Sequence, residues 1–296
     1  MITSPISRRI ALSSISTGVL GLPIIAGTLA SSNTEASETQ MKGRLKQSVS
    51  KWCYNKFIEA NSFAKFCEEC KKMGMVGIDL VGPDDWPVIL DHGLVPTMVP
   101  GAGSIANSCN NKNLHPKLLE DFKKNITAAA KHKIRNVITF SGNRHGMTDE
   151  EGWENCTPVL KEAAKIAEAE GVTINMELLN SKVDHKDYQC DHTEWGVELC
   201  KRVESPHFKL LYDIYHMQIM EGDIIRTIRK HIQYIGHFHT GGNPGRNEID
   251  ETQELYYPAI MCAIAELDYD GYVAHEFVPK QPSLDTLQAA VKLCDV

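Results

Sequence analysis

Four acidic or imidazole side chains stand at the ends of four short apolar segments in the second half of the chain. They are Glu177, Asp213, His239 and Glu276. If each segment is a strand of one parallel barrel, the carboxyl ends of the strands share one mouth and the four side chains converge there. Two glutamates, one aspartate and one histidine form an oxygen-rich ligand set that suits Mn²⁺, Mg²⁺ or Co²⁺ and does not exclude Zn²⁺. Because unpaired buried carboxylates are costly, this pattern predicts a divalent metal site.

Two of the neighbouring polar side chains are candidates for holding a substrate. Arg246 follows the glycine-rich loop after His239, where its planar guanidinium can clamp a carboxylate through two hydrogen bonds; the alternative is a solvated loop position. His216 comes three residues after Asp213 and is placed to hydrogen-bond a substrate hydroxyl.

Strand alternation and loop position suggest further candidates. His237 shares a strand face with His239, so we expect it to hydrogen-bond to that ligand and to border the substrate pocket. His275 lies on the opposite face from Glu276 and is expected to pack beneath the helices. The loop after the strand that ends near Glu177 supplies the remaining candidates for the pocket lining, which are Asn180, Lys182 and His185.

The elements that must position these side chains alternate between β-rich and helical segments from about residue 46 onward, which is typical of parallel βα units. Helical periodicity marks Pro116–Lys131 and Thr157–Ala169, with Gly171 ending the second helix. The eight expected strands are Gln47–Tyr54, Val76–Val81, Leu94–Val99, Asn136–Phe140, Val172–Leu178, Phe208–Ile214, Tyr234–Thr240 and Gly271–Phe277.

Eight such units predict an α/β fold, a single (β/α)₈ TIM barrel over residues 47–296, because a closed parallel sheet leaves no strand edge unpaired. The short connection from Gly82 to Gly93 leaves room only for an abbreviated helix. An open, doubly wound sheet is the alternative, and Gly101 to Ala106 matches a dinucleotide-binding G-x-G-x-x-A pattern. The polar run at residues 107–113 stands where the phosphate-binding helix would begin, so this match is weak.

Composition restricts the class of protein and its partners. With 42% hydrophobic and 23% charged residues, the 296-residue chain is neither disordered nor fibrous. Its formal charge of −7 repels polyanions, so no nucleic-acid partner is expected. The nine cysteines are scattered, and Cys67 and Cys70 share an apolar helical face, so we expect mostly buried thiols. The sequence leaves a homo-oligomer open.

The first 46 residues differ in character from the rest. Arg8 and Arg9 precede an apolar stretch from Ile10 to Ala30 that has no charged residue, which resembles a twin-arginine export signal over residues 1–30. Residues 31–46 are polar and read as a flexible spacer. The mature protein is then expected in the periplasm without stable membrane insertion; the alternative is an uncleaved membrane anchor.

The chain from about residue 46 to its end resembles the xylose isomerase-like barrel superfamily and, within it, the hydroxypyruvate isomerase family. The matching motifs are Asn175–Asn180, Asp213–Gln218, Ile235–His239, Pro244–Glu248 and Gly271–Pro279. The resemblance implies that Glu177 and Glu276 are metal-binding acid/base residues and that Asp213 is a metal ligand. The fourth ligand in hydroxypyruvate isomerases is commonly a glutamine, whereas this chain has His239, as the related ketose 3-epimerases do.

The resemblance and the ligand set together predict a metal-dependent aldose–ketose type isomerase that acts through a cis-enediolate on a small hydroxy-keto acid or sugar. Conversion of hydroxypyruvate to tartronate semialdehyde is the favoured reaction. The alternatives are a ketose 3-epimerase, a related sugar isomerase or a dehydratase on the same barrel. A metal-dependent nuclease would need more histidine and carboxylate ligands and a basic groove, and a sugar-binding protein would not need both glutamates.

The predicted leader can be tested by fractionating cells that express the full chain. We expect a mature protein, shortened by about the length of the leader, in the periplasmic fraction. A full-length protein in the membrane fraction would support the uncleaved anchor instead.

Overall fold

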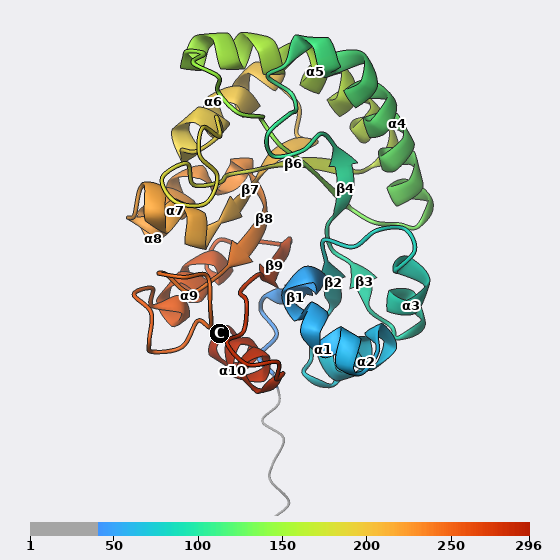
Figure 1. Ribbon diagram of the computed structural model, residues 1–296, viewed down its shortest axis with the longest axis vertical. Coiled ribbons are helices and arrows are strands. Elements are labelled where there is room, and N and C mark those ends of the chain that lie inside the picture. The colour runs from blue at the N-terminus through green and yellow to red at the C-terminus, as the bar shows by residue number, and fades with distance from the viewer. Residues whose placement is uncertain (1–40) are drawn as a thin grey trace, which may run out of the picture. The chain divides into compact units, whose positions relative to one another are not determined.

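A single sheet of parallel strands surrounds the centre of the protein (Figure 1). The computed structural model describes residues 41–296, and within them the sheet order is β3-β2-β1-β9-β8-β7-β6-β5-β4. The strands are β1 (Lys46–Ser50), β2 (Gly77–Asp79), β3 (Val95–Pro96), β4 (Val99–Ala102), β5 (Asn136–Thr139), β6 (Thr173–Glu177), β7 (Phe208–Asp213), β8 (Ile235–Thr240) and β9 (Tyr272–His275). β1 pairs with both β2 and β9, which joins the first strand to the last and confirms the predicted TIM barrel.

Helices cover the outside of this sheet (Figure 1). They are α1 (Asn55–Ala60), α2 (Phe63–Lys72), α3 (Trp86–Asp91), α4 (His115–Lys131), α5 (Asp149–Glu170), α6 (Thr193–Val203), α7 (Ile214–Met220), α8 (Ile224–His231), α9 (Tyr257–Ala265) and α10 (Asp285–Leu293). Local sequence sets several boundaries: Thr148 and Glu151 form a capping box at the start of α5, and Gly171 ends it in the left-handed conformation. The connection between β2 and β3 carries only the six-residue α3, as its length predicts.

Two strands differ from the sequence prediction by more than two residues at one end. The first ends at Ser50, because its neighbours offer partners only as far as Asp79 and His275, and residues 51–54 continue as a 3₁₀ helix. The third expected strand, Leu94–Val99, divides into β3, which pairs with β2, and β4, which pairs with β5. Residues 97 and 98 connect the two, so on this side the chain itself closes the ring.

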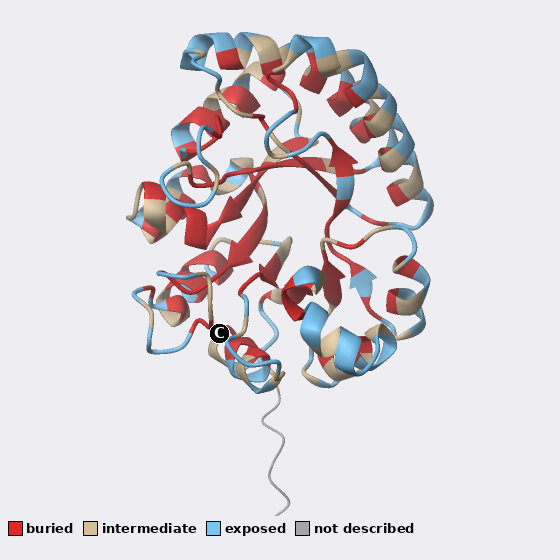
Figure 2. Cartoon of the chain, viewed as in Figure 1, coloured by how far each residue is buried: buried red, intermediate tan, exposed pale blue. Residues whose placement is uncertain are grey.

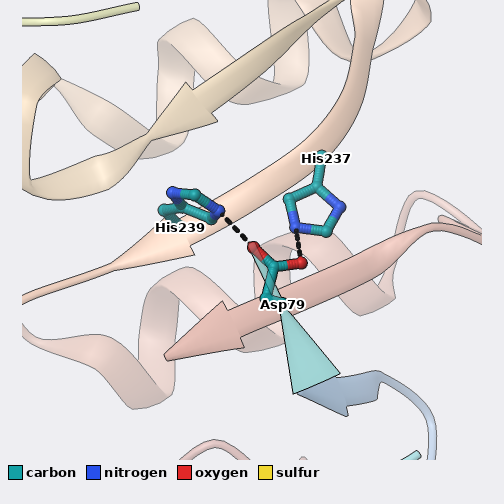
Figure 3. A group of neighbouring side chains, drawn as sticks. All are labelled: Asp79, His237 and His239. Carbon is teal, nitrogen blue, oxygen red and sulfur yellow. Dashed lines mark hydrogen bonds and ion pairs between the residues drawn. The ribbon is translucent and has the colours of Figure 1, made fainter. Parts of the chain in front are cut away.

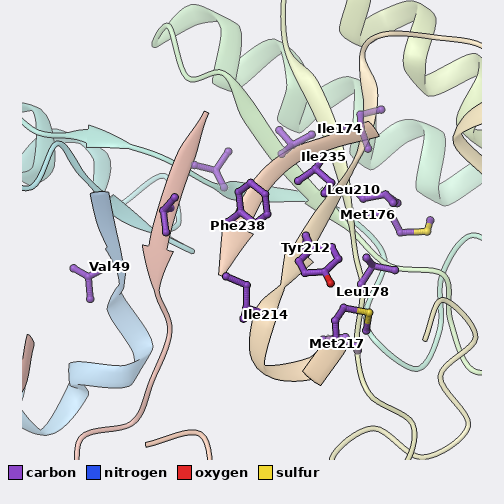
Figure 4. Close-up of a cluster of buried hydrophobic side chains, with 14 of the residues drawn as sticks. Val49, Ile174, Met176, Leu178, Leu210, Tyr212, Ile214, Met217, Ile235 and Phe238 are labelled. Atoms are coloured by element: carbon purple, nitrogen blue, oxygen red, sulfur yellow. The ribbon is translucent and has the colours of Figure 1, made fainter. Parts of the chain in front are cut away.

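The core is divided by the alternation of side chains along the strands. Outward-facing residues such as Ile174, Met176, Leu210 and Phe238 belong to the large apolar cluster between sheet and helices (Figures 2 and 4). Leu211, which points the opposite way from Leu210, belongs instead to a small separate cluster with Met98 and Ile138. The interior of the barrel therefore contains one small apolar cluster, and the remaining inward positions are free to carry polar residues.

The cysteines follow the prediction. All nine are free thiols; eight are buried and only Cys262 is exposed. Cys67 and Cys70 lie on the buried face of α2, and burial raises the pKa of Cys67 to about 12. Such a thiol stays protonated, so this C-x-x-C pair belongs to the core.

The amino-terminal predictions fall largely outside the described residues. The leader at 1–30 and residues 31–40 of the spacer are not described, whereas residues 41–46 lie against the barrel. Leu45 is buried, and the backbone N–H groups of Lys42 and Gly43 donate to the Asp295 carboxylate at 2.7 and 2.9 Å. Within residues 41–296, none of the helices combines the length and the hydropathy that a bilayer crossing requires.

Candidate active site

The four predicted ligands meet at the carboxyl end of the sheet. Glu177 ends β6, Asp213 ends β7, His239 lies near the end of β8 and Glu276 directly follows β9. One ligand atom from each lies within 4.8 Å of the others, and all four residues are buried. Because β6, β7, β8 and β9 are neighbours in this order, the two glutamates stand at the outer ends of the row and Asp213 and His239 lie between them.

The two ring nitrogens of His239 face different groups. Nε2 lies 2.9 Å from Asp79 Oδ2, as a hydrogen bond requires. Nδ1 lies 2.7 Å from Glu276 Oε2, 3.6 Å from Glu177 Oε1 and 3.9 Å from Asp213 Oδ2. When Nε2 donates its proton to Asp79, the lone pair of Nδ1 points at the three carboxylates, which is the orientation that a metal-binding histidine needs.

Asp79 was missed by the sequence prediction. It is the last residue of β2, has no exposed surface, and lies 3.1 Å from His237 Nε2 as well as 2.9 Å from His239 Nε2 (Figure 3). Thr97 Oγ1 donates at 2.6 Å to Asp79 Oδ1, the oxygen that faces His237. Burial alone would raise the pKa of Asp79, but the facing His237 and His239 lower it, so that the carboxyl stays ionised. The sequence signal that could have identified Asp79 as a site residue is an aspartate near the carboxyl end of an expected strand.

Asp79, His237 and His239 form a second close group of metal-type ligands. The two groups share His239, and a neutral imidazole offers only one unprotonated nitrogen. Burial favours the neutral ring, but the facing carboxylates raise the pKa of His239 well above its usual value, so a metal ion at Nδ1 would displace that nitrogen's proton while Nε2 keeps its hydrogen bond to Asp79. The group with three carboxylates is therefore the metal-site candidate. His237 lies behind it against Asp79, and the hydrogen bond to His239 that its strand position suggested is not formed.

The other candidates lie in different surroundings. His216 is buried, its Nε2 is 3.7 Å from Asp213 Oδ2, and Asn180 contacts its Nδ1 at 2.6 Å. The ring of His185 lies 5.3 Å from that of His216, measured between centroids. The ammonium of Lys182 instead donates to two backbone carbonyls at the end of α7, at 3.0 and 2.9 Å, where it compensates the helix terminus. His275 is buried among Thr240 and Gln47, on the face opposite Glu276.

Arg246 reaches into the site from the loop after β8. Its Nη2 donates to Glu276 Oε2 at 2.6 Å and lies 3.4 Å from Asp213 Oδ2, while its buried Nε has no hydrogen-bond partner among residues 41–296. The guanidinium lies over the rings of Trp52 and Tyr215, at 5.4 and 5.5 Å from their centroids. Arg246 is therefore a site residue and not a solvated loop arginine.

The loop that carries Arg246 is tightly held. Arg246 has a φ of 56°, its N–H donates to Gly242 O at 2.8 Å, and its carbonyl accepts from Val278 N at 2.8 Å. At Gly242 a Cβ atom would lie 2.1 Å from the carbonyl oxygen of Glu248, so only glycine fits there. Trp52, in the 3₁₀ helix after β1, also enters the site and donates from its indole to Glu276 Oε1 at 2.7 Å. Sequence reasoning missed Trp52 because it was assigned to the first strand.

The electrostatics of the site differ between the two glutamates. Burial raises the pKa of Glu177 above its usual value, although the His239 imidazole, whose Nδ1 lies 3.6 Å from Glu177 Oε1, opposes this. Burial acts on Glu276 in the same direction, but the charges of His239 and Arg246 outweigh it and hold the pKa of Glu276 well below its usual range. Burial also lowers the pKa of His216, with Arg246 adding to the effect, so that this ring is neutral.

Fold and site together define a TIM barrel with a buried cluster of carboxylates and imidazoles at its carboxyl-end mouth. The family model of the xylose isomerase-like TIM barrel matches residues 89–294. The chain belongs to this family.

Among its relatives is the 2-oxo-tetronate isomerase of Cupriavidus necator, which is 36% identical over 118 residues, or 40% of this chain and 45% of the relative. The hydroxypyruvate isomerase of Escherichia coli is 26% identical over 243 residues, or 76% of this chain and 90% of the relative. The resemblance to hydroxypyruvate isomerases is thus confirmed. The chain spans about half the length of several other curated relatives that it matches.

A solved structure supports the fold. The crystal structure of a D-psicose 3-epimerase, determined in the presence of D-fructose, superposes with a TM-score of 0.66 and 18% identity, covering 84% of this chain and 90% of the other. At this identity the similarity shows the barrel architecture.

Replacing Asp79 with asparagine tests the contact behind His239. We expect Asp79→Asn to fold and to weaken Mn²⁺ binding about 10- to 100-fold, because the variant loses the charged acceptor that orients the ring. Isothermal titration with Mn²⁺ measures this. Asp270→Asn is the matched control, since Asp270 is exposed and paired with Lys46 away from the site, and its Mn²⁺ affinity should match the unsubstituted protein. Unchanged affinity in Asp79→Asn would refute the orienting role.

Proposed function

We propose that this protein is a metal-dependent isomerase that moves a proton between two adjacent carbons of a small hydroxy-keto acid, with hydroxypyruvate converted to tartronate semialdehyde. The observation that carries this proposal is the row of four buried side chains in which Glu177 and Glu276 flank Asp213 and His239. Such a row offers two carboxylates for proton transfer on either side of a ligand cluster.

The residues present fit a divalent metal ion. Three buried carboxylates lie close together, and the buried Nδ1 of His239, which faces them, makes no hydrogen bond of its own within residues 41–296. Glu177, Asp213, His239 and Glu276 would hold the ion, and the donor set of oxygens with one imidazole suits Mn²⁺, Mg²⁺ or Co²⁺, with Zn²⁺ also acceptable. A bound divalent ion would polarise the substrate carbonyl and stabilise negative charge on the neighbouring oxygens.

The chain's own residues supply the proton transfer. One of the two glutamates removes a proton from C3 of hydroxypyruvate, and the electrons of that C–H bond form the C2–C3 double bond of an enediolate. A proton is then returned to C2, and the hydroxyl proton passes from the C3 oxygen to the C2 oxygen, so that the C2 oxygen becomes a hydroxyl and the C3 oxygen a carbonyl. Trp52 and Arg246 bind the two carboxylate oxygens of Glu276 and hold its orientation. Burial of both glutamates keeps water away from the carbon acid.

Arg246 is the residue that binds the carboxylate of the substrate in this proposal. The guanidinium lies over the rings of Trp52 and Tyr215, and its Nε is buried and unpartnered within the described chain. A planar fork in this setting favours a carboxylate substrate over a neutral sugar. His216 remains the candidate for contacting substrate oxygens, with Asn180 and His185 beside it.

A ketose 3-epimerase is the second candidate function. It is favoured by the identity of the fourth ligand, because His239 stands where hydroxypyruvate isomerases commonly have a glutamine. It needs the same two glutamates, and it differs in the substrate, a neutral ketose. The net charge of −7 continues to disfavour a nuclease on this barrel.

Proton NMR in D₂O tests the reaction and the roles of the glutamates. With Mn²⁺-loaded protein we expect hydroxypyruvate to exchange its C3 hydrogens and to convert, and removal of the metal with EDTA to stop both. Glu177→Gln and Glu276→Gln should each lower kcat at least about 100-fold and keep the circular dichroism of the fold, because each removes one acid/base group. Near-normal turnover in either variant would overturn its role. Exchange at C3 of fructose alone would identify the epimerase.

Arg246→Lys tests the class of substrate. Lysine keeps the positive charge beside Glu276 but lacks the planar fork, so KM for hydroxypyruvate should rise about tenfold with kcat changed much less. Steady-state kinetics measure both constants. An equal loss of kcat with KM unchanged would show that Arg246 serves Glu276 and not the substrate carboxylate.

A further inference from the structure

The side chain of Asn180 is buried and uses all of its hydrogen-bonding capacity. Its Oδ1 accepts from the backbone N–H groups of Val183 and Asp184, both at 2.9 Å. Its Nδ2 contacts Asp184 Oδ2 at 2.7 Å and His216 Nδ1 at 2.6 Å. A backbone N–H can only donate, so the atom that meets two of them is the oxygen, and the orientation of the amide follows from the backbone alone.

This orientation determines the protonation of His216. The Asn180 Nδ2 group can only donate, so His216 Nδ1 must accept and cannot carry a proton. The single proton of the neutral ring is then on Nε2. That nitrogen is buried, has no hydrogen-bond partner among residues 41–296, and lies 3.7 Å from Asp213 Oδ2.

Asp184, which accepts the other hydrogen of the Asn180 amide, is itself held in place. Asp184 Oδ2 accepts from the Tyr215 hydroxyl at 2.9 Å in addition to the Asn180 amide. Tyr215 lies beneath the Arg246 guanidinium, so the network connects the loop after β6 with the start of α7 and with the site. The two hydrogens of the Asn180 amide thus have separate acceptors, Asp184 and His216.

We propose that Asn180 is a positioning residue that fixes His216 as the Nε2–H tautomer and makes it a hydrogen-bond donor into the site. The group bound opposite His216 is then a hydrogen-bond acceptor, such as a carbonyl, carboxylate or enediolate oxygen of the substrate. This consequence for substrate binding rests on the proposed function, whereas the tautomer itself does not.

The tautomer is measured directly in ¹⁵N-histidine-labelled protein without metal or substrate. Long-range ¹H–¹⁵N correlation should show His216, assigned by comparison with a His216→Asn spectrum, with a protonated Nε2 and an unprotonated Nδ1. In Asn180→Asp the side chain becomes an acceptor of similar shape, so Nδ1 of His216 should gain a proton. A protonated Nδ1 in the unsubstituted protein, or an unchanged ring in Asn180→Asp, would overturn the proposal.

Ser181→Ala is the matched control, because Ser181 lies next in the same loop but donates to Asp191 at 2.5 Å. It should leave the His216 tautomer unchanged. A hydroxypyruvate titration adds the functional arm: Asn180→Asp should weaken binding about tenfold or more and leave Mn²⁺ affinity close to normal. If the tautomer is as proposed but hydroxypyruvate does not bind the unsubstituted protein, the proposed substrate is wrong and the positioning role stands.

Discussion

The structure depends on placing four ionisable carboxyl groups in the interior of one barrel and compensating their charge. Asp79, Glu177, Asp213 and Glu276 are all buried, and mutual repulsion and lost hydration would make this arrangement unstable without partners. The compensation comes from a small set of cationic or proton-donating groups: His237 and His239 on Asp79, and Arg246 on Glu276. A divalent ion at the four-residue cluster would complete this balance.

Because these buried charges need compensation, many polar side chains at the mouth of the barrel hold other side chains in a fixed orientation. Arg246 is held by a loop that tolerates only glycine at position 242 and by contact with the rings of Trp52 and Tyr215, and the Trp52 indole donates to the second oxygen of Glu276. A neighbouring side chain determines which ring nitrogen carries the proton in each histidine: Asp79 for His239 and Asn180 for His216. The site therefore depends on the residues that orient its side chains as much as on the residues that would touch a ligand.

Much of this was predictable from sequence, since strand alternation and the meeting of parallel strand ends place Glu177, Asp213, His239 and Glu276 together. Asp79 was not predicted, because the segment around it reads as a strand to Val81, whereas β2 ends at Asp79 and Leu80 turns to a φ of 53°. Trp52 was missed for the same reason. The contact of Lys182 with the end of α7 is a tertiary interaction to which no local pattern points.

The division of the third expected strand also affects the barrel as a whole. β3 and β4 are the two ends of the sheet order, yet they follow one another along the chain and are joined covalently by residues 97 and 98. The backbone N–H of Thr97 donates to Ile78 O at 2.9 Å and that of Val81 donates to Met98 O at 3.3 Å, so this link stays bonded to the β2 side of the ring before β4 pairs with β5. The ring is therefore closed by one extended segment that changes its partner along its length. A shift of β2 relative to β5 would have to distort this covalent link, so the two sides of the barrel are tied together here, while the four ligand-bearing strands lie where each strand is paired with both neighbours.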